Sequence, residues 1–246
     1  MRKRNNQMIR MFLGMMVILL VLPATACSKK TYLDVKTLFD DEEGLTYTED
    51  TVSFDRRRSA KLFRDGTVEE GEGFVVSYTV QGNDPEYLYA NSGGLYVELE
   101  EEVEEEIEGF GKNLWHNLII FHDPWGQMHA SACMWIIENG PYAQKDDGAF
   151  YKTDMAFAKA SNPIDVMIVY YNEAYYVSLD NSCKVKLTAD MVPAQEERMN
   201  TETFFKAGKR KIGLRSAGTG ATFSKINYSI GNEAALEALK EMKMDE

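Results

Sequence analysis

Residues 208–229 read GKRKIGLRSAGTGATFSKINYS, and the interpretation of this stretch decides the fold. Its glycines and basic residues resemble a loop that cradles phosphate. Such a loop needs a helix directly after its glycines, because the N–H groups of that helix bind the anion. Here Gly218-Thr219-Gly220 leads into ATFSKINYS, which alternates β-branched or aromatic residues with polar ones, and no Gly-Lys-Ser/Thr follows. The stretch therefore predicts a strand over 211–215, a turn over 216–220 and a return strand over 222–229, which close a β-sandwich.

Short alternating segments recur along the rest of the chain. β-branched and aromatic residues alternate with polar ones, as in half-buried strands, and turn-forming residues separate the segments. Further strands are expected within 45–63, 73–82, 93–100, 113–137 and 164–188, and the end of a tether over 28–38 is expected to become the first strand.

Turn residues and helix formers complete this prediction. One short helix is expected after Pro193, and NEAALEALKEMKM at 232–244 predicts a C-terminal helix with Asn232 as its N-cap. Many short strands with regular turns predict an all-β fold, a two-sheet antiparallel β-sandwich with a short C-terminal helix. Turns are expected at Asp65-Gly66, Asp123–Gly126, Asn172-Glu173 and Asp180–Ser182.

The N-terminal residues predict export and lipidation. Four basic residues precede an apolar run over 11–22, which is too short to span a ~30 Å hydrocarbon core but suits a signal peptide. LPATAC follows and resembles the lipobox of bacterial lipoproteins, although Ala24 stands where leucine is commoner. The resemblance implies that Cys27 becomes the acylated (palmitate-bearing) first residue of a cell-membrane-anchored, extracytoplasmic protein. The alternative is an ordinary signal peptide, cleaved after Ala-Thr-Ala, with Cys27 unmodified.

Length and charge limit the domain organisation and the partners. We expect a signal peptide over 1–26, a lipidated tether over 27–37, one sandwich domain over 38–230 and the C-terminal helix over 231–246. Without the four basic residues of the leader, 23 basic residues stand against 39 acidic ones, a net charge near −16. Such a chain is unsuited to nucleic acid, because affinity for nucleic acid depends on neutralising phosphates. Its only expected contact with the membrane is through the lipid anchor.

Two segments carry a family resemblance. YYNEAYYVSLDNSCKVKL at 170–187 resembles a hairpin of the concanavalin A-like lectin/glucanase superfamily, which includes laminin G-like domains. KIGLRSAGTGATFSKINYS resembles its closing segment, with Ile226-Asn227 as the apolar-Asn pair. The resemblance spans 73–229 and implies a jelly roll of two curved antiparallel sheets. Members of the superfamily bind glycans, cleave them or serve as protein-interaction modules, so the fold does not choose the function.

The run ELEEEVEEEIE holds eight glutamates in eleven residues, 98–108. Glycanases of the superfamily place acidic residues alternately along one strand, and a retaining pair of carboxylates needs a separation of ~5–5.5 Å. Glu98, Glu100 and Glu102 would share a strand face, but the central aspartate of the family pattern is missing. Two other interpretations stay open: a solvated acidic strand end, and capture of calcium by carboxylate oxygens.

The segment 114–137 contains every histidine and every tryptophan of the chain. If Pro124 and Trp125 are the central turn residues, His122 pairs with Gln127 and Ile120 with His129. One face would then be apolar and would belong to the core: Trp115, Asn117, Ile119, Phe121, Met128, Ala130, Ala132 and Met134. The other face would mix rings with polar groups: His116, Leu118, Ile120, His122, Gln127, His129, Ser131, Cys133 and Trp135.

The mixed face suits a sugar, because aromatic rings cover the C–H side of a pyranose and planar polar groups bond its hydroxyls. The alternative is that the tryptophans fill the sandwich and the histidines make local hydrogen bonds. A one-residue slip of the register would exchange the two faces. A zinc site would need the histidines to converge, which strand spacing does not assure. The candidate ligand-binding residues are His116, His122, Asp123, Trp125, Gln127, His129 and Trp135.

Cys133 and Cys183 could form a disulfide in an exported protein or stay as two buried thiols, and spacing does not decide between these states. No metal-type cysteine cluster exists in the sequence. The leading hypothesis is a lipid-anchored module that binds carbohydrate without catalysis and without a required cofactor. The alternatives are a protein-interaction or structural module of the cell envelope, and a glycoside hydrolase that uses Glu98, Glu100 or Glu102.

Overall fold

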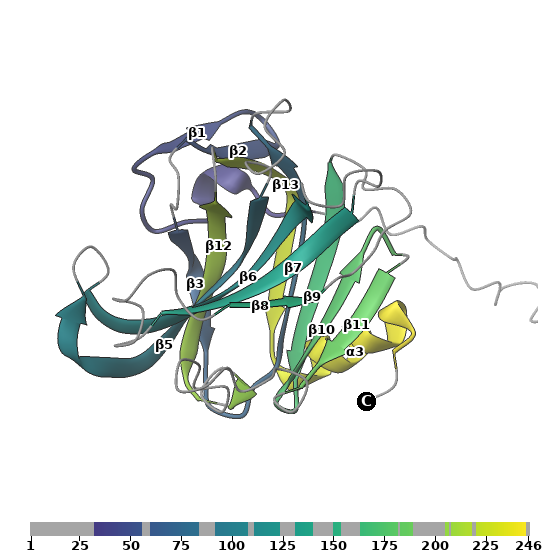
Figure 1. Ribbon diagram of the computed structural model, residues 1–246. Coiled ribbons are helices and arrows are strands. Elements are labelled where there is room, and N and C mark those ends of the chain that lie inside the picture. The colour runs from purple at the N-terminus through teal and green to yellow at the C-terminus, as the bar shows by residue number, and fades with distance from the viewer. Residues whose placement is uncertain are drawn as a thin grey trace, which may run out of the picture. The chain divides into compact units, whose positions relative to one another are not determined.

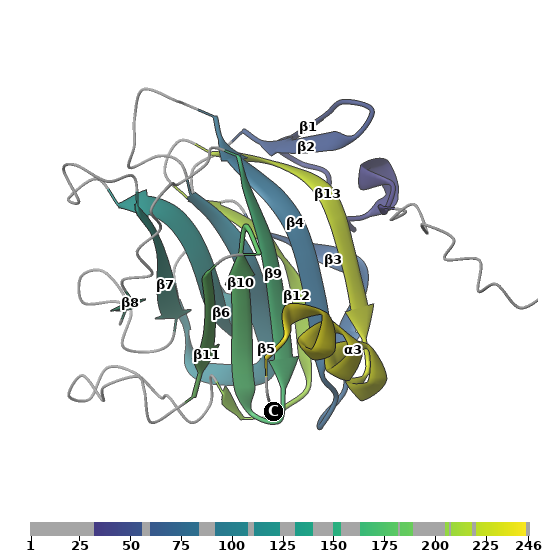
Figure 2. The same ribbon diagram turned by 90° about the vertical axis from the view of Figure 1, so that its right-hand side faces the viewer.

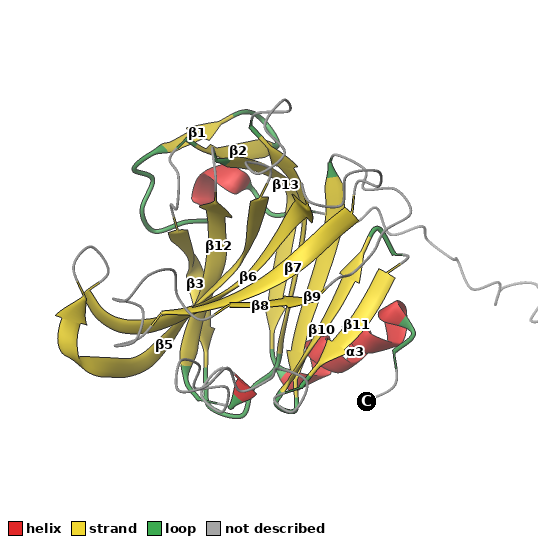
Figure 3. Cartoon of the chain, viewed as in Figure 1, coloured by secondary structure: helices red, strands yellow, loops and turns green. Residues whose placement is uncertain are grey.

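Two antiparallel β-sheets form the part of the chain that the computed structural model describes (Figures 1 and 3). Among the described residues between 92 and 153, side chains are described for 93–99, and for the others the description is of the backbone and its pairing. The described residues are 32–55, 60–83, 92–107, 111–123, 131–139, 150–153, 163–181, 183–188, 205–206, 208–217 and 220–244. Residues 32–246 form one compact unit.

The two sheets have seven and six strands, and all neighbouring strands run antiparallel. The seven-stranded sheet has the order β1 (Leu45–Tyr47), β2 (Thr51–Phe54), β13 (Ala221–Ile230), β4 (Phe74–Gly82), β9 (Ile164–Tyr171), β10 (Ala174–Leu179) and β11 (Cys183–Leu187). The six-stranded sheet has the order β3 (Ala60–Val68), β12 (Arg210–Ala217), β5 (Ser92–Ile107), β6 (Gly111–Asp123), β7 (Ser131–Asn139) and β8 (Phe150–Thr153). With the C-terminal helix α3 (Asn232–Met242), this arrangement confirms the predicted fold class.

The stretch at 208–229 forms two strands, as predicted, but they are not a hairpin. β12 pairs with β3 and β5 in one sheet, whereas β13 pairs with β2 and β4 in the other. The turn between them therefore carries the chain across the sandwich. Gly220 has φ 107°, and a Cβ there would lie 2.7 Å from the Asn83 side-chain nitrogen and closer still to the Phe54 carbonyl. Only glycine fits this crossing.

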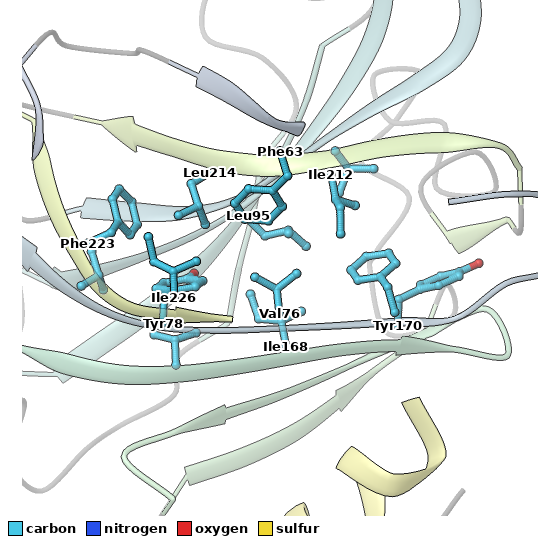
Figure 4. Packing of buried hydrophobic residues seen from close by; sticks show 14 of the residues in the cluster. Phe63, Val76, Tyr78, Leu95, Ile168, Tyr170, Ile212, Leu214, Phe223 and Ile226 are labelled. Atoms are coloured by element: carbon cyan, nitrogen blue, oxygen red, sulfur yellow. The ribbon is translucent and has the colours of Figure 1, made fainter. Parts of the chain in front are cut away.

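The core lies between the sheets and is filled by the inward positions of the strands (Figure 4). Leu95, Ile212 and Leu214 come from the six-stranded sheet and meet Val76 and Ile168 from the seven-stranded sheet, all of them fully buried. Aromatic rings pack among them, with Phe74 stacked on Tyr170 at 5.5 Å between ring centroids. Burial of apolar surface of this kind, at roughly 25 cal/mol per Å², holds the two sheets together.

A buried cation closes one end of the core. Arg210 is 1% exposed, and its guanidinium carbon lies 4.4 Å from the centroid of the Tyr170 ring. Its Nε donates to the Gly208 carbonyl at 2.9 Å, its Nη1 donates to the Tyr175 hydroxyl at 3.3 Å, and its Nη2 donates to the Lys206 carbonyl. Carbonyl oxygens and an aromatic face thus replace water around the charge. This set of contacts gives Arg210 a structural role.

Helix α3 covers part of the outer side of the seven-stranded sheet (Figure 2). Ala235, Leu239 and Met242 pack on Val169 and Tyr176. The predicted N-cap is wrong by one residue, because Gly231 occupies that position without a side-chain cap. No helix among the described residues is long and apolar enough to cross a membrane.

Two further sequence predictions are corrected near the N-terminus. The end of the tether forms a 3₁₀ helix, η1 (Val35–Thr37), and not a strand, because the Asp34 side chain accepts from the N–H of Lys36 and caps that turn. Asp65-Gly66 lies inside β3, where four residues bulge opposite Ile212. A Cβ on Gly66 would come within 2.6 Å of the Ile212 carbonyl, so this glycine allows the bulge and not a turn.

The turns within β9–β10–β11 are confirmed. Asn172 and Glu173 have φ of 48° and 56° and join Tyr171 to its partner Ala174. Asp180 and Asn181 have φ of 48° and 55°, in the connection between β10 and β11. Left-handed residues match the right-handed twist of tight hairpins, and asparagine and aspartate adopt them at low cost. The predicted helix after Pro193 lies outside the described residues.

The predicted pairing of the histidine and tryptophan hairpin is wrong. β6 and β7 pair Asp123 with Ser131, His122 with Ala132 and Ile119 with Trp135, five residues beyond the predicted partners. Residues 124–130 connect the strands, in place of a two-residue turn. Because the shift is odd, it exchanges faces between the two strands. Pairing with β5 on one side and β8 on the other fixes this register, and it outweighs the Pro-Trp turn signal.

Candidate functional site

The side of the six-stranded sheet that points away from the core is the candidate site, and we call it the outer face. On β5 the inward residues are Leu95, Val97 and Leu99, so the alternate residues belong to the outer face. On β12 the inward residues are Ile212 and Leu214. On these two strands the described side chains and glycines of the outer face are Gly94, Tyr96 and Glu98 on β5 and Lys211, Gly213 and Arg215 on β12.

Arg215, Tyr96 and Glu98 form a polar cluster on the outer face. The Tyr96 hydroxyl donates to Glu98 Oε2 at 3.2 Å. Burial raises the pKa of Tyr96 far above its ordinary value, the Glu98 carboxylate raises it further, and the Arg215 cation acts in the opposite direction. Tyr96 therefore stays neutral and keeps donating to Glu98. Tyr96 and Arg215 are 9% and 6% exposed, whereas Glu98 is half-buried and Lys211 is exposed.

Two glycines make room for the large members of this cluster. The register places Arg215 opposite Gly94 and Tyr96 opposite Gly213, so each large side chain faces a position without one. Gly213 is also required by the neighbouring strand, since a Cβ there would come within 2.7 Å of Leu62 Cα and closer still to the Lys61 carbonyl. Backbone packing and side-chain placement thus depend on the same glycine.

The register extends the outer face across the other strands of the sheet. Gly94 pairs with Ile119, which pairs with Trp135, which pairs with Lys152. The neighbouring row runs from Tyr96 through Asn117 and Ile137 to Phe150, and the next from Glu98 through Trp115 to Asn139. Alternation therefore places both tryptophan positions on the face that holds Arg215, Tyr96 and Glu98.

The predicted ligand-binding residues divide among three places. Trp135 and Asp123 occupy outer-face positions. His116 pairs with the inward residue Val97, and His122 is on the same side of β6, so both histidines occupy core-side positions. The prediction that they share a face with Trp135 is wrong. Trp125, Gln127 and His129 lie outside the described residues, as does Cys27. The assignment of a ligand to any of these residues stays a prediction.

The two cysteines lie in strands of different sheets, Cys133 in β7 and Cys183 in β11. Cys133 pairs with Phe121, and Cys183 pairs with Leu179. Their redox state stays open.

The acidic run continues β5 beyond the sheet. β5 pairs with β12 only up to Leu99, and the later residues pair with β6 alone, so they form a two-stranded ribbon that Figure 1 shows reaching past the other strands. The register shifts by two residues between Glu98 and Glu102, so Glu102 pairs with Asn113, on the side of β6 that also holds the Trp115 position. Among the described side chains, no group of three or more metal-ligating residues converges.

Sequence reasoning missed Tyr96, Lys211 and Arg215 as members of the site. Both GLYVEL at 94–99 and KIGLR at 211–215 alternate apolar and polar residues, so each strand reveals its own outer side. Nothing in the sequence reveals that the two strands are neighbours, since more than a hundred residues separate them. The signal was local alternation, and the missing information was the strand order.

Comparisons with known proteins find similar solved structures, some of them lectin-like, but no matching family. No family model matches the sequence, and no curated protein matches it. Three similar solved structures are a legume lectin-like domain from Entamoeba histolytica, the carbohydrate-binding module CBM66 from Bacillus subtilis and the alginate lyase AlyC3. Their identities to this chain are 10%, 9% and 13%, and their TM-scores are 0.43, 0.44 and 0.44. The matches cover 75%, 75% and 80% of this chain. They cover 86%, 90% and 79% of the three other chains, in the same order. At these values the matches assign neither ligand nor activity.

Proposed function

We propose that the chain is a lipid-anchored, extracytoplasmic protein whose β-sandwich, a concanavalin A-like jelly roll, binds carbohydrate without catalysis. The observation that carries the proposal is the outer face of the six-stranded sheet. There a tyrosine, a carboxylate and a guanidinium lie beside register positions held by Trp115, Asn117 and Trp135. Helix α3 packs on the other sheet.

The residue types of the outer face fit the chemistry of a sugar. Indole and phenol rings present large, rigid apolar surfaces with a polar edge, which suits the C–H side of a pyranose. Amide, carboxylate and guanidinium groups bond hydroxyls in defined directions, and charged partners strengthen those bonds.

The position of Glu98 favours binding over hydrolysis. Two-carboxylate glycoside hydrolysis needs a pair of acids at a defined separation across the sugar. Glu98 is the one acidic side chain among the described outer-face residues of β5 and β12, and it accepts the Tyr96 hydroxyl. Beyond Leu99 the acidic run lies in the ribbon that pairs with β6 alone.

Direct binding tests the proposal. Full-length protein in mild detergent is titrated with a broad glycan panel, once with calcium and once with chelator. We expect saturable binding to one glycan class, weakened at least tenfold by Trp135→Ala, because a stacked ring contributes on the order of 1 kcal/mol or more. Tyr32→Ala, which removes a half-exposed ring on the N-terminal segment, is the matched control and leaves affinity unchanged. Binding that survives Trp135→Ala and Tyr96→Ala would contradict the site.

A second function, a protein-interaction module of the cell envelope, is favoured by the acidic composition. A net charge of −12 for the whole chain, with eight glutamates concentrated in residues 98–108, suits a basic protein partner. The same titrations distinguish the two functions, since a folded protein that binds no glycan under either condition supports this second one.

A further inference from the structure

We propose that the outer face takes an acidic oligosaccharide, one whose sugars carry carboxylate or sulfate groups. This inference rests on the proposed carbohydrate-binding function and names the class of its ligand. Arg215, Lys211 and the Lys152 position supply three cations within three rows of the face, against Glu98 within the same rows and the Asp123 and Glu102 positions at their margins.

The local charge of these rows is opposite to that of the whole chain. The chain has a formal net charge of −12, so its overall field repels anions. Residues 211 to 215 nevertheless place two cations on one face of β12, where the register sets them against Glu98 and Gly94 of β5. On these two strands the outer face therefore holds two cations, Lys211 and Arg215, and one carboxylate, Glu98, which also accepts the Tyr96 hydroxyl.

Arg215 is suited to bind an anion because of where it lies. A guanidinium recognises carboxylate and sulfate through paired N–H groups, and it does so more strongly in a poorly solvated site. Arg215 is 6% exposed and couples electrostatically to Tyr96 across the space left by Gly213 and Gly94. Lys211 is exposed and adds a second cation further along the same strand.

The spacing of the cations favours an oligomer over a single sugar. Arg215 and Lys211 are four residues apart on one strand, about 13 Å at ~3.3 Å per residue. Arg215 and Lys152 are four strands apart in one row, about 19 Å at ~4.8 Å per strand. One monosaccharide cannot reach two of these positions, whereas a chain with repeated charges reaches them in turn.

The acidic ribbon helps to fix where such a ligand lies. Beyond Leu99 and Trp115, β5 and β6 pair only with each other, and the β5 side of this ribbon is rich in glutamate. These glutamates repel an acidic oligosaccharide from this end of the face. The ligand is therefore confined to the three rows between Arg215 and Lys211.

Matched oligosaccharides test the inference. Full-length protein in mild detergent is titrated with oligogalacturonate, with the same oligosaccharide after reduction of its carboxyl groups, and with a sulfated oligosaccharide of similar length. We expect the acidic forms to bind at least tenfold more tightly than the reduced one. We also expect the affinity to fall when salt rises from 50 mM to 500 mM, because salt screens exposed charges.

Variants locate the cations. Lys211→Ala is expected to weaken acidic binding about threefold and Arg215→Gln at least tenfold, with little effect on any neutral glycan. Lys240→Ala removes the same charge from the exposed side of α3 and serves as the control. Because Arg215 is buried, the folding of its variant is checked by circular dichroism. If Arg215→Gln is unfolded, the variant of the exposed residue, Lys211→Ala, decides the outcome.

The outcomes separate this inference from the proposed function. Tighter binding of oligogalacturonate identifies uronate carboxylates as the recognised group, and tighter binding of the sulfated probe identifies sulfate. Equal or better binding of the reduced, neutral form overturns the inference and leaves the proposed function standing. Failure of every glycan to bind folded protein overturns the proposed function itself.

Discussion

Gly213 shows how one residue couples the fold to the candidate site. Gly213 pairs with Tyr96 of β5 on one side. On the other side it lies against the backbone of β3 at Lys61 and Leu62, next to the bulge in that strand. A methyl group there has no room on the side of β3, and backbone atoms cannot rotate away as a flexible side chain can. Substitution must therefore separate β12 from β3.

We predict that Gly213→Ala destabilises the protein by about 1–3 kcal/mol, the usual cost of overpacking a close contact. The free energy of unfolding is measured by denaturant titration. Gly208→Ala is the matched control, since no atom lies within 4 Å of a Cβ at Gly208, and its effect should stay within about 0.5 kcal/mol. Equal effects of the two substitutions would contradict the steric explanation.

A second residue-scale prediction concerns the ion pair of Asp41 and Lys61. Lys61 is 7% exposed and donates to the Asp41 carboxylate, which also accepts the N–H of Glu43 at 2.8 Å. The hydrogen bond from Lys61, followed by that from Glu43, lowers the pKa of Asp41 below its ordinary value of 3.8. A native pKa lower than the unfolded one means that the native state binds protons more weakly.

This shift contributes stability above pH 3.8 that is lost as the pH falls through the lower native pKa. We therefore predict that Asp41→Asn is less stable than the parent at neutral pH, and that the difference shrinks as the pH falls below 3.8. Urea midpoints between pH 7 and pH 2.5 measure this. Glu49→Gln, at an exposed position, controls for net charge. A difference that is constant over this range would exclude the linkage.

At the scale of elements, Asn232 connects α3 to the sheet that it covers. Its Oδ1 accepts the N–H of Gly73 at 2.7 Å, and its Nδ2 donates to the Gly71 carbonyl at 3.3 Å. The residue predicted to cap the helix instead attaches it to the start of β4. The helix could be predicted from its own residues, but its attachment could not, because Gly73 and Asn232 are 159 residues apart.

We predict that Asn232→Ala lowers the free energy of unfolding by about 1–2 kcal/mol, although alanine is the better helix former. The loss comes from the unsatisfied Gly73 N–H, and hydrogen exchange of that amide should quicken at the same time. Glu237→Ala on the exposed side of α3 is the control and should leave both measurements unchanged. A stability gain in Asn232→Ala would show that propensity outweighs the attachment.

The hairpins show which elements a sequence can predict. Asn172-Glu173 and Asp180-Asn181 adopt positive φ in short connections, so local turn chemistry predicted β9, β10 and β11 correctly. Pro124-Trp125 suggested an equally short turn between β6 and β7, and the register proved to be five residues away. In that pair the partners on either side, β5 and β8, determine the register, and they are distant in sequence.

At the scale of the whole molecule, the lipobox-like sequence before Cys27 makes a prediction about location. We expect the wild-type protein to be found in the membrane fraction and to incorporate labelled palmitate. Cys27→Ala should release it to the soluble fraction, because each buried CH₂ of an acyl chain contributes about 0.8 kcal/mol of anchoring. Cys183→Ala is the control and should stay in the membrane fraction. Soluble wild-type protein without label would support the ordinary signal peptide.

The sequence alone determined the features that depend on neighbouring residues. The alternation of polar and apolar residues specified the strands, helix formers specified α3, and Thr222–Ser229 excluded a phosphate-binding helix after Gly220. The acidic composition also came directly from the sequence. The tertiary structure decided that β12 and β13 belong to different sheets and that Arg215 lies beside Tyr96. It also decided that Trp135 shares a face with the Ile119 position and not with His122. These outcomes depend on which distant strands pair and in which register, and burial of the whole sandwich core, not local propensity, selects that pairing.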